Sequence, residues 1–383
     1  MIFSYAFRPF FLAAGSWAVV AMILWLATFE GHLRLPTHFQ PVVWHIHEML
    51  FGFVLAAITG FLLTAIPNWT KRQPVAGNTL AILVALWLVG RIVCLFSAKL
   101  AGLVGVVADF AFPAALIVVT GNEILAARNW RNFPIVLLLG VFAIGDVLIY
   151  LEAYDFAVPH GLGIRLALAV PILLIGVIGG RIVPNFSRNW LVQRAAERLP
   201  SPPNRFDTVA ATMLQSSLLL WVVLPDSRII GLLLILAAIL NGLRMSRWAG
   251  YKTLAEPLLF ILHVGYFWVV AGIALLGLSV IRVGIPNLAA IHALTAGAMG
   301  TMILAVMPRV TLGHTGRTLS ANGPTTLMFV LINVAAIGRI AASWNGRELM
   351  ILLILSGACW IAAFALFDAI YGPLLLAPRE VQG

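Results

Sequence analysis

Residues 44–66 read WHIHEMLFGFVLAAITGFLLTAI, and this stretch decides the fold. From Met49 to Ile66 it carries no charged side chain. A run of about 20 apolar residues is long enough to cross the hydrocarbon core of a bilayer as a helix. The start of the stretch places two imidazoles and a carboxylate at the mouth of that run. Ionisable groups are costly there, so we interpret His45, His47 and Glu48 as a functional site.

The composition of the whole chain indicates a membrane protein. Of its 383 residues, 62% are hydrophobic and only 10% are charged, whereas a soluble domain is about 25% charged. The apolar runs are continuous rather than alternating, which favours helices over a barrel. The net charge of +10 lies mainly in short loops between the runs, so it indicates membrane topology and no nucleic-acid partner. Cys94 and Cys359 form no CxxC motif, so neither a disulfide framework nor covalent haem attachment is expected.

We predict an all-α polytopic membrane protein in which residues 1–383 form a single integral membrane domain. It should contain about twelve transmembrane helices. The predicted spans are 9–29, 44–66, 78–97, 101–122, 134–151, 162–184, 208–224, 228–244, 257–279, 286–307, 324–342 and 348–372.

The inner ends of three predicted spans resemble one another. Ile66-Pro67-Asn68-Trp69, Val183-Pro184-Asn185-Phe186 and Met307-Pro308-Arg309 recur at intervals of about 120 residues. Each of these motifs ends a span four helices after the previous one. The spacing therefore predicts three four-helix units in a pseudo-threefold arrangement.

The distribution of Lys and Arg predicts the orientation in the membrane. Basic residues are most frequent in the segments that would be cytoplasmic if both termini are cytoplasmic, which places His45 and His47 near the outer face. Residues 185–207 are then a cytoplasmic loop. We expect a short interfacial helix within it, with an ordinary solvated loop as the alternative.

His45 and His47 cannot both point toward the same bound group. Residues at i and i+2 of a helix point about 200° apart. Either His45 and His47 belong to two different centres, or one is a ligand and the other a proton relay. Glu48 could orient an imidazole from behind, as carboxylates do beside metal-bound histidines. The alternative is a polar helix terminus satisfied by water.

Two later spans also carry histidines. His292, early in the tenth span, forms a stripe with Thr295 and Met299 that could line the edge of a haem, although packing explains the methionine as well. His263 is followed at i+3 by Tyr266, and it could ligate a second metal centre or transfer protons. A hydrogen bond from His263 to a neighbouring helix is the alternative.

Four charged residues within predicted spans suggest two ion pairs. Arg91 and Asp109 are equally distant from one tight turn, and Asp146 and Arg165 from another, so each pair can meet in an antiparallel hairpin. Pairing would make their burial in the membrane tolerable. In the functional alternative, Arg91 or Arg165 binds a haem propionate.

Several long motifs closely resemble the NnrS family of haem-containing membrane proteins, which are linked to the nitric oxide response of bacteria. The likeness covers nearly the whole chain, in the motifs 7–11, 44–49, 60–70, 180–186, 292–302 and 309–317. It implies twelve spans, bound b-type haem, copper as a further candidate and a place in the bacterial inner membrane. The chain also looks like the catalytic subunit of haem-copper oxidases and nitric oxide reductases. The His-His pair on the seventh span of that subunit is missing here.

These observations together predict a haem-binding redox protein that binds and reduces nitric oxide, with quinol or another donor supplying electrons. His47 and His292 are the predicted ligands of one haem, and His45 and His263 those of a second haem or a copper ion. Glu48 is a predicted catalytic residue. The full set of predicted site residues is His45, His47, Glu48, Arg91, Arg165, His263, Tyr266 (catalytic), His292 and Met299.

Two other functions remain open from the sequence. A sensor of nitric oxide or a haem-delivery protein would bind haem without turnover. A membrane transporter would also fit twelve spans with an internal repeat, and it would have unwound helices near the midplane. Membrane lipid is a partner in every case.

Overall fold

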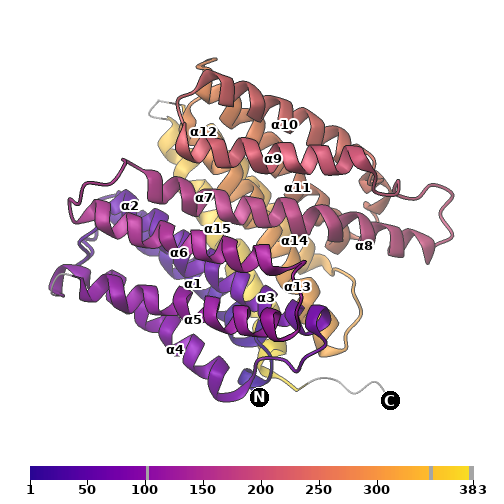
Figure 1. Ribbon diagram of the computed structural model, residues 1–383, viewed down its shortest axis with the longest axis horizontal. Coiled ribbons are helices and arrows are strands. Elements are labelled where there is room, and N and C mark those ends of the chain that lie inside the picture. Colours follow the sequence, from indigo (N-terminus) through magenta and orange to yellow (C-terminus); the bar gives the residue numbers. More distant parts are fainter. Residues whose placement is uncertain (101–102, 345–347, 379–383) are drawn as a thin grey trace. The chain divides into compact units, whose positions relative to one another are not determined.

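The computed structural model describes residues 1–100, 103–344 and 348–378 (Figure 1). Within these residues all regular structure is helical, and twelve helical segments are long and apolar enough to cross a membrane. A helix satisfies its own backbone hydrogen bonds, which is why such segments cross lipid in this form. The prediction of an all-α polytopic membrane protein is confirmed. The predicted cytoplasmic C-terminus, beyond Pro378, lies outside the described residues.

The helices follow one another along the chain without any intervening soluble domain in the described ranges. Their bounds are η1 Ile2–Ser4, α1 Phe7–Phe29, α2 Pro41–His47, η2 Glu48–Val54, α3 Leu55–Thr70, α4 Gly77–Leu95, η3 Ser97–Lys99, α5 Val104–Ala126, α6 Phe133–Ala153, α7 Leu162–Leu174, η4 Ile175–Gly179, α8 Gly180–Val192, α9 Arg205–Val223, α10 Arg228–Ser246, η5 Gly250–Thr253, α11 Pro257–Val280, α12 Asn287–His292, η6 Ala293–Gly300, α13 Thr301–Thr315, α14 Gly323–Ala341 and α15 Glu348–Leu376.

The helices form two compact units. Unit 1 contains Met1–Val170, Val310–Arg317 and Phe367–Gly383, and unit 2 contains Pro171–Arg309 and Thr318–Leu366.

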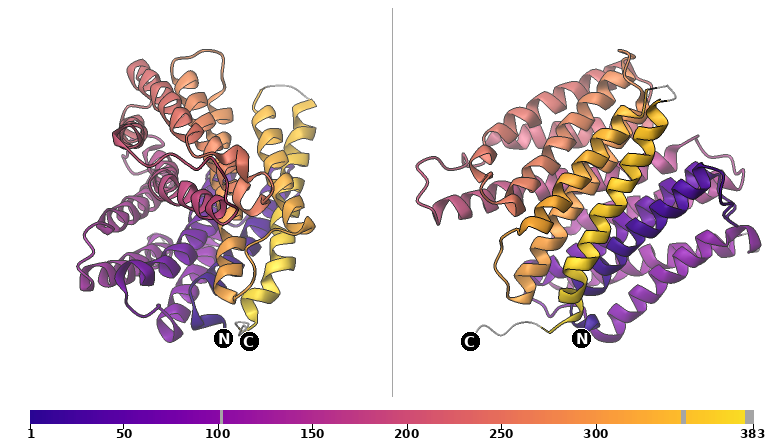
Figure 2. Two further views of the ribbon diagram at one scale, coloured as in Figure 1. Left: turned by 90° about the vertical axis from the view of Figure 1, so that its right-hand side faces the viewer. Right: turned by 180° about the vertical axis from the view of Figure 1, so that it is seen from behind.

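In unit 1, α1 packs against α3 and η2, and α5 packs against both α4 and α6. The last part of α15 runs beside α1, as Figure 2 shows in yellow and indigo. Two contacts join these segments: the Ser16 hydroxyl donates to Asp368 Oδ2 at 3.0 Å, and Arg8 Nη1 donates to the Leu375 carbonyl at 2.8 Å. Within unit 1, the end of the last span is therefore joined to the first span.

In unit 2, α10 packs against α9 and α11, and α11 also contacts α8 and η6. Small residues let α10 and α11 approach closely. A Cβ added to Gly277 would lie 2.6 Å from the Gly231 carbonyl oxygen. Close approach through glycine is the usual way in which membrane helices gain packing contacts.

Three of the spans contain a π-helical segment: η2 lies in Pro41–Thr70, η4 in Leu162–Val192 and η6 in Asn287–Thr315. These are the second, sixth and tenth spans, the ones whose predicted inner ends resemble one another. A π-helical turn adds one residue and redirects the side chains around it, and it is frequent at functional sites. The recurrence every four spans accords with the predicted repeat, while the pseudo-threefold arrangement stays a prediction.

Two predicted span ends need correction. The sixth span does not end at residue 184, because α8 continues to Val192, and the tenth does not end at 307, because α13 continues to Thr315. A proline inside a helix removes one backbone hydrogen bond, and the helix resumes after it. Residues 185–192 are therefore part of a long helix and not a separate interfacial one.

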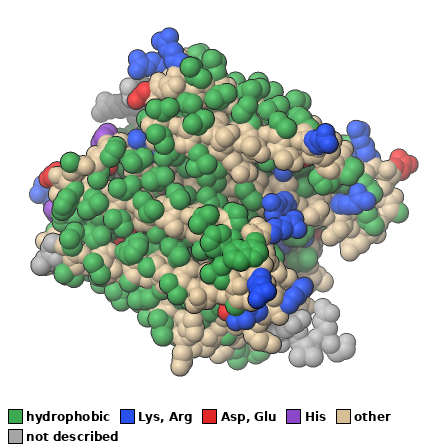
Figure 3. Space-filling model, in the orientation of Figure 1, with side chains coloured by type: hydrophobic (Ala, Val, Ile, Leu, Met, Phe, Trp, Pro, Cys, Tyr) green, Lys and Arg blue, Asp and Glu red, His purple; other side chains and the backbone are tan. Residues whose placement is uncertain are grey.

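The surface agrees with a membrane location. In the view of Figure 3, hydrophobic side chains are spread over much of the face, and the Lys and Arg side chains are few and lie mostly at its top and in its right-hand half. Large apolar side chains such as Ile229 and Val107 are about two-thirds exposed, at 70% and 68%. Apolar surface of this extent is expected where lipid rather than water surrounds the helices.

Candidate functional site

A cluster of polar side chains lies buried inside unit 1, within membrane spans. It brings together residues of α2, η2, α4, α5 and α6, and none of its members is more than 2% exposed. We call it the His47 cluster, and its members are His47, Glu48, Arg91, Cys94, Asp109, Asp146 and Tyr150. Burial of this many ionisable groups in a membrane is costly, which marks the cluster as the candidate site.

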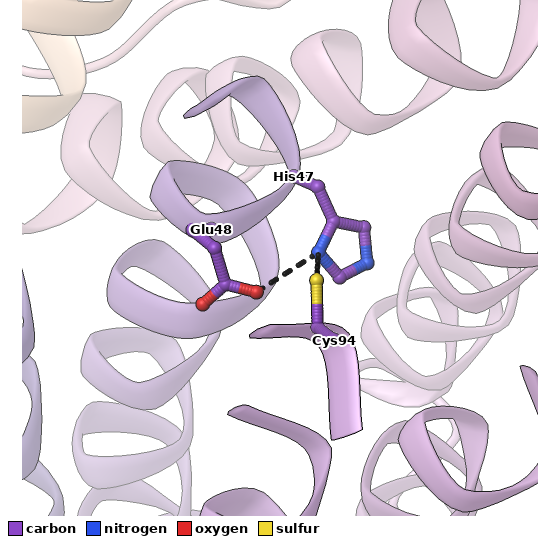
Figure 4. A group of neighbouring side chains, drawn as sticks. All are labelled: His47, Glu48 and Cys94. Atoms are coloured by element: carbon purple, nitrogen blue, oxygen red, sulfur yellow. Dashed lines mark hydrogen bonds and ion pairs between the residues drawn. The ribbon is translucent and has the colours of Figure 1, made fainter. Parts of the chain in front are cut away.

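The His47 imidazole lies at the centre of the cluster and is contacted at both ring nitrogens. Nδ1 lies 3.2 Å from Glu48 Oε1 and 3.4 Å from Cys94 Sγ (Figure 4). Nε2 lies 2.8 Å from Asp146 Oδ1 and 3.2 Å from Asp109 Oδ2. A neutral imidazole carries only one N–H, whereas here both nitrogens face carboxylate oxygens.

Arg91 joins two of the carboxylates. Its Nη1 donates to Glu48 Oε1 and its Nη2 donates to Asp109 Oδ1, both at 2.6 Å. Tyr150 donates its hydroxyl to the other oxygen of Asp109, Oδ2, at 2.9 Å. The predicted pair of Arg91 and Asp109 is therefore confirmed, with Glu48 as an additional partner. Short hydrogen bonds between ionised groups are among the strong ones in proteins.

The second predicted pair, Asp146 with Arg165, is wrong. Asp146 binds His47, and Arg165 Nη1 donates to the His160 carbonyl at 2.9 Å. The prediction considered only the two helices of one hairpin, whereas a third helix, α2, supplies the partner of Asp146.

The local sequence explains how His47 and Glu48, adjacent in the chain, both enter the cluster. The π-helical segment η2 begins at Glu48, directly after His47. Gly52, on this segment, leaves the space that the neighbouring side chains need: a Cβ there would lie 2.2 Å from Trp17 Nε1 and 3.0 Å from Glu48 Oε2. Trp87 also donates its indole N–H to the Gly52 carbonyl at 2.9 Å.

Aromatic rings enclose the imidazole of His47. Phe39 and Phe51 lie with their centroids 5.2 and 5.0 Å from it, and Tyr150 meets it edge-on at 5.3 Å. The rings exclude water from the cluster, which strengthens electrostatic interactions inside it.

His45 lies apart from this cluster. Its ring is half-buried and stacks on Trp25, with the centroids 4.5 Å apart. The two histidines of the opening stretch thus have different surroundings, and the predicted metal-ligand role of His45 stays a prediction.

In unit 2, His292 ends α12, immediately before the π-helical segment η6. Its Nδ1 lies 2.8 Å from the Leu288 carbonyl oxygen, which can only accept, so Nδ1 carries the proton and Nε2 carries the lone pair. Metal-bound histidines are oriented in the same way. Met299 is buried at 2% exposure. The predicted sharing of one haem by His292 and His47 involves both units and stays a prediction.

His263 and Tyr266 make contacts that join the helices of unit 2. His263 Nε2 lies 2.7 Å from Ser187 Oγ, and a Cβ added to Gly250 would lie 2.6 Å from His263 Nδ1, so neighbouring groups cover both nitrogens. Tyr266 donates to Asn241 Oδ1 at 2.9 Å and accepts from Arg244 Nη1 at 3.1 Å. These geometries fit a packing role, and the predicted metal-binding and catalytic roles stay predictions.

Replacing Tyr266 with Phe tests that packing role. The change leaves the buried Arg244 and Asn241 each without one partner, so it should lower the free energy of unfolding by about 1–3 kcal/mol. Thermal unfolding in detergent measures the change, and Tyr251→Phe, at a residue 56% exposed, is the control. Unchanged stability in Tyr266→Phe would contradict the packing role.

Sequence reasoning missed three features of the cluster: Cys94, Tyr150 and the contacts of both aspartates with His47. One signal was available. Arg91, Asp109 and Asp146 are the charged residues inside the predicted third, fourth and fifth spans, 78–97, 101–122 and 134–151, and each lies near the same side of the predicted bilayer as His47. Residues of different spans can share a site only if they lie at a similar depth in the bilayer.

Comparison with known proteins gives one family. A family model described as NnrS protein matches residues 1–379. No curated protein matches the chain.

Proposed function

The chain belongs to the NnrS family, which is linked to the nitric oxide response, and from this premise we propose a haem-binding protein that reduces nitric oxide. Its location in this proposal is the bacterial cytoplasmic membrane. Nitric oxide is small and uncharged, so it reaches a site inside membrane spans without an aqueous path.

The observation that carries the proposal is the orientation of His292. The hydrogen bond from Nδ1 to the Leu288 carbonyl directs the lone pair of the neutral ring to Nε2, the nitrogen through which His292 would hold haem iron. The ring lies at the junction of α12 with η6, where the π-helical turn alters the side-chain directions. The haem would be b-type, because the sequence has no CxxCH motif for covalent attachment.

The overall reaction is 2 NO + 2 e⁻ + 2 H⁺ → N₂O + H₂O. Haem iron supplies a position that binds nitric oxide and a path for electrons. Within unit 2, the chain's own part is to hold the His292 ring in one tautomer. Electrons come from quinol or another membrane donor, since no electron-carrier domain occurs among the described residues.

Purified protein in detergent tests the proposal. We expect a Soret band, consumption of nitric oxide when a reductant is added, and loss of most bound haem in His292→Ala. The control is His32→Ala, because the His32 side chain is 76% exposed in a loop and should leave the spectrum unchanged. Absence of a Soret band in the unchanged protein would refute haem binding. Haem without nitric oxide consumption would favour a sensor or a haem-delivery protein.

A further inference from the structure

We propose that the His47 cluster binds one divalent first-row metal ion through His47 Nε2, Asp109 Oδ2 and Asp146 Oδ1. The proposal concerns unit 1 alone and does not depend on haem. It rests on the spacing of the donor atoms, on the charge of the cluster and on the surroundings of each donor.

The spacing of the donors suits a metal ion. The nitrogen lies 2.8 Å from the Asp146 oxygen and 3.2 Å from the Asp109 oxygen, and all three atoms lie within 4.8 Å of one another. Ligands about 2.1 Å from one ion, at tetrahedral or octahedral angles, are separated by about 3.0–3.4 Å. Small movements of the side chains would therefore bring all three atoms to bonding distance.

The charges of the cluster leave a deficit that matches such an ion. Glu48, Asp109 and Asp146 carry three negative charges when ionised, and Arg91 carries one positive charge. Two negative charges remain uncompensated inside a membrane span, where unpaired charge is costly. A divalent ion neutralises them. An imidazolium at His47 would neutralise only one.

A metal ion also explains why both ring nitrogens of His47 face carboxylate oxygens although a neutral imidazole has only one N–H. With the ion on Nε2, the single N–H lies on Nδ1 and donates to Glu48 Oε1, 3.2 Å away. This is the carboxylate–histidine–metal arrangement found in many metalloproteins. Tyr150 donates to Asp109 Oδ2 and supports that ligand in the same way. Glu48 thus orients the ligand rather than binding the ion.

A second group of donors lies on the other side of the ring, formed by His47 Nδ1, Glu48 Oε1 and Cys94 Sγ. The contacts of Arg91 favour the aspartate group as the metal site. Its Nη1 occupies Glu48 Oε1 at 2.6 Å, so a metal there would compete with a guanidinium for the same oxygen. On the aspartate side, Arg91 binds Oδ1 of Asp109 and leaves Oδ2 to the metal. One nitrogen and two carboxylate oxygens favour divalent ions such as Zn²⁺, Mn²⁺ and Fe²⁺ over thiophilic Cu⁺.

The full-length protein, stripped with a chelator and equilibrated with Zn²⁺ or Mn²⁺ separately, tests the proposal. Elemental analysis after gel filtration should give one ion per chain. Asp146→Asn and Asp109→Asn should each weaken binding by more than about 100-fold, and Glu48→Gln by about 10–100-fold, the range typical of outer-shell partners. Cys94→Ala removes only the donor of the thiol side, so it should keep one ion per chain and distinguishes the two donor groups.

Cobalt(II) gives an independent readout of the donor set. Its bound spectrum should lack the intense thiolate charge-transfer band, both in the unchanged protein and in Cys94→Ala. Variants that do not elute as a single folded species are excluded. The number of ions bound per chain of the unchanged protein then tests the proposal without them. Less than one ion per chain would overturn the proposal and leave a cluster neutralised by protons alone. Loss of binding in Cys94→Ala, with binding kept in Asp146→Asn, would overturn it by placing the metal on the thiol side.

Discussion

Replacing Arg91 with Met should lower the free energy of unfolding of the metal-free protein by about 3–5 kcal/mol, the usual cost of removing one partner from a buried ion pair. Arg91 is 2% exposed and bridges Glu48 to Asp109. Met has a similar length but no charge, so both carboxylates would stay buried with no cation between them. Thermal and denaturant unfolding in one detergent measure the change, and expression is expected to fall as well.

Removing the charges of the two carboxylates that Arg91 binds tests whether the guanidinium acts through its charge. Adding Glu48→Gln and Asp109→Asn to Arg91→Met removes the uncompensated carboxylates, so most of the lost stability should return. A triple variant as unstable as Arg91→Met would show that the guanidinium acts through packing and not through its charge.

Arg72→Met is the control for a surface pair. The Glu123 carboxylate, 2.6 Å from Arg72 Nε, raises the pKa of the Arg72 guanidinium, so the guanidinium keeps its charge. Arg72 is nonetheless exposed to solvent, which screens the interaction. Its replacement should leave the unfolding transition unchanged within error.

The positions of the spans could be predicted from the sequence because continuous apolar runs have one stable form in a bilayer. Two of the helix ends could not. Pro184 and Pro308 were natural places to end a helix, yet α8 reaches Val192 and α13 reaches Thr315. One missing N–H is a small loss when the remaining backbone bonds re-form after the proline.

Contacts between residues of different spans could be predicted only where the two spans follow one another in the chain. Arg91 and Asp109 flank one turn, so equal distances from that turn predicted their contact. The contact of His47 with Asp146 joins the second span to the fifth, and no count of residues along the chain gives the distance between two such helices. The π-helical segment that starts at Glu48 also has no sequence signature comparable to a proline or a cap. A cluster assembled from several spans thus becomes visible only in three dimensions.

Replacing Gly163 with Ala should destabilise unit 1 by an amount at the upper end of the range of about 1–3 kcal/mol for overpacking. A Cβ at this position would lie 2.7 Å from the Ile149 backbone nitrogen and 2.8 Å from the Gly145 carbonyl oxygen. Both atoms belong to the backbone of α6, so no side-chain rotation relieves the clash. Either α6 or α7 has to move.

The same displacement links packing to the site, because Gly145 is followed directly by Asp146. Moving α6 away from α7 would shift the carboxylate that lies 2.8 Å from His47 Nε2. Gly163→Ala should therefore weaken the proposed metal binding as well as lower the unfolding temperature. Gly140→Ala, also on α6, meets no atom within 4 Å and should be neutral or more stable by about 1 kcal/mol. A Gly163→Ala protein that unfolds like the unchanged one would show that α6 and α7 are not in this close contact.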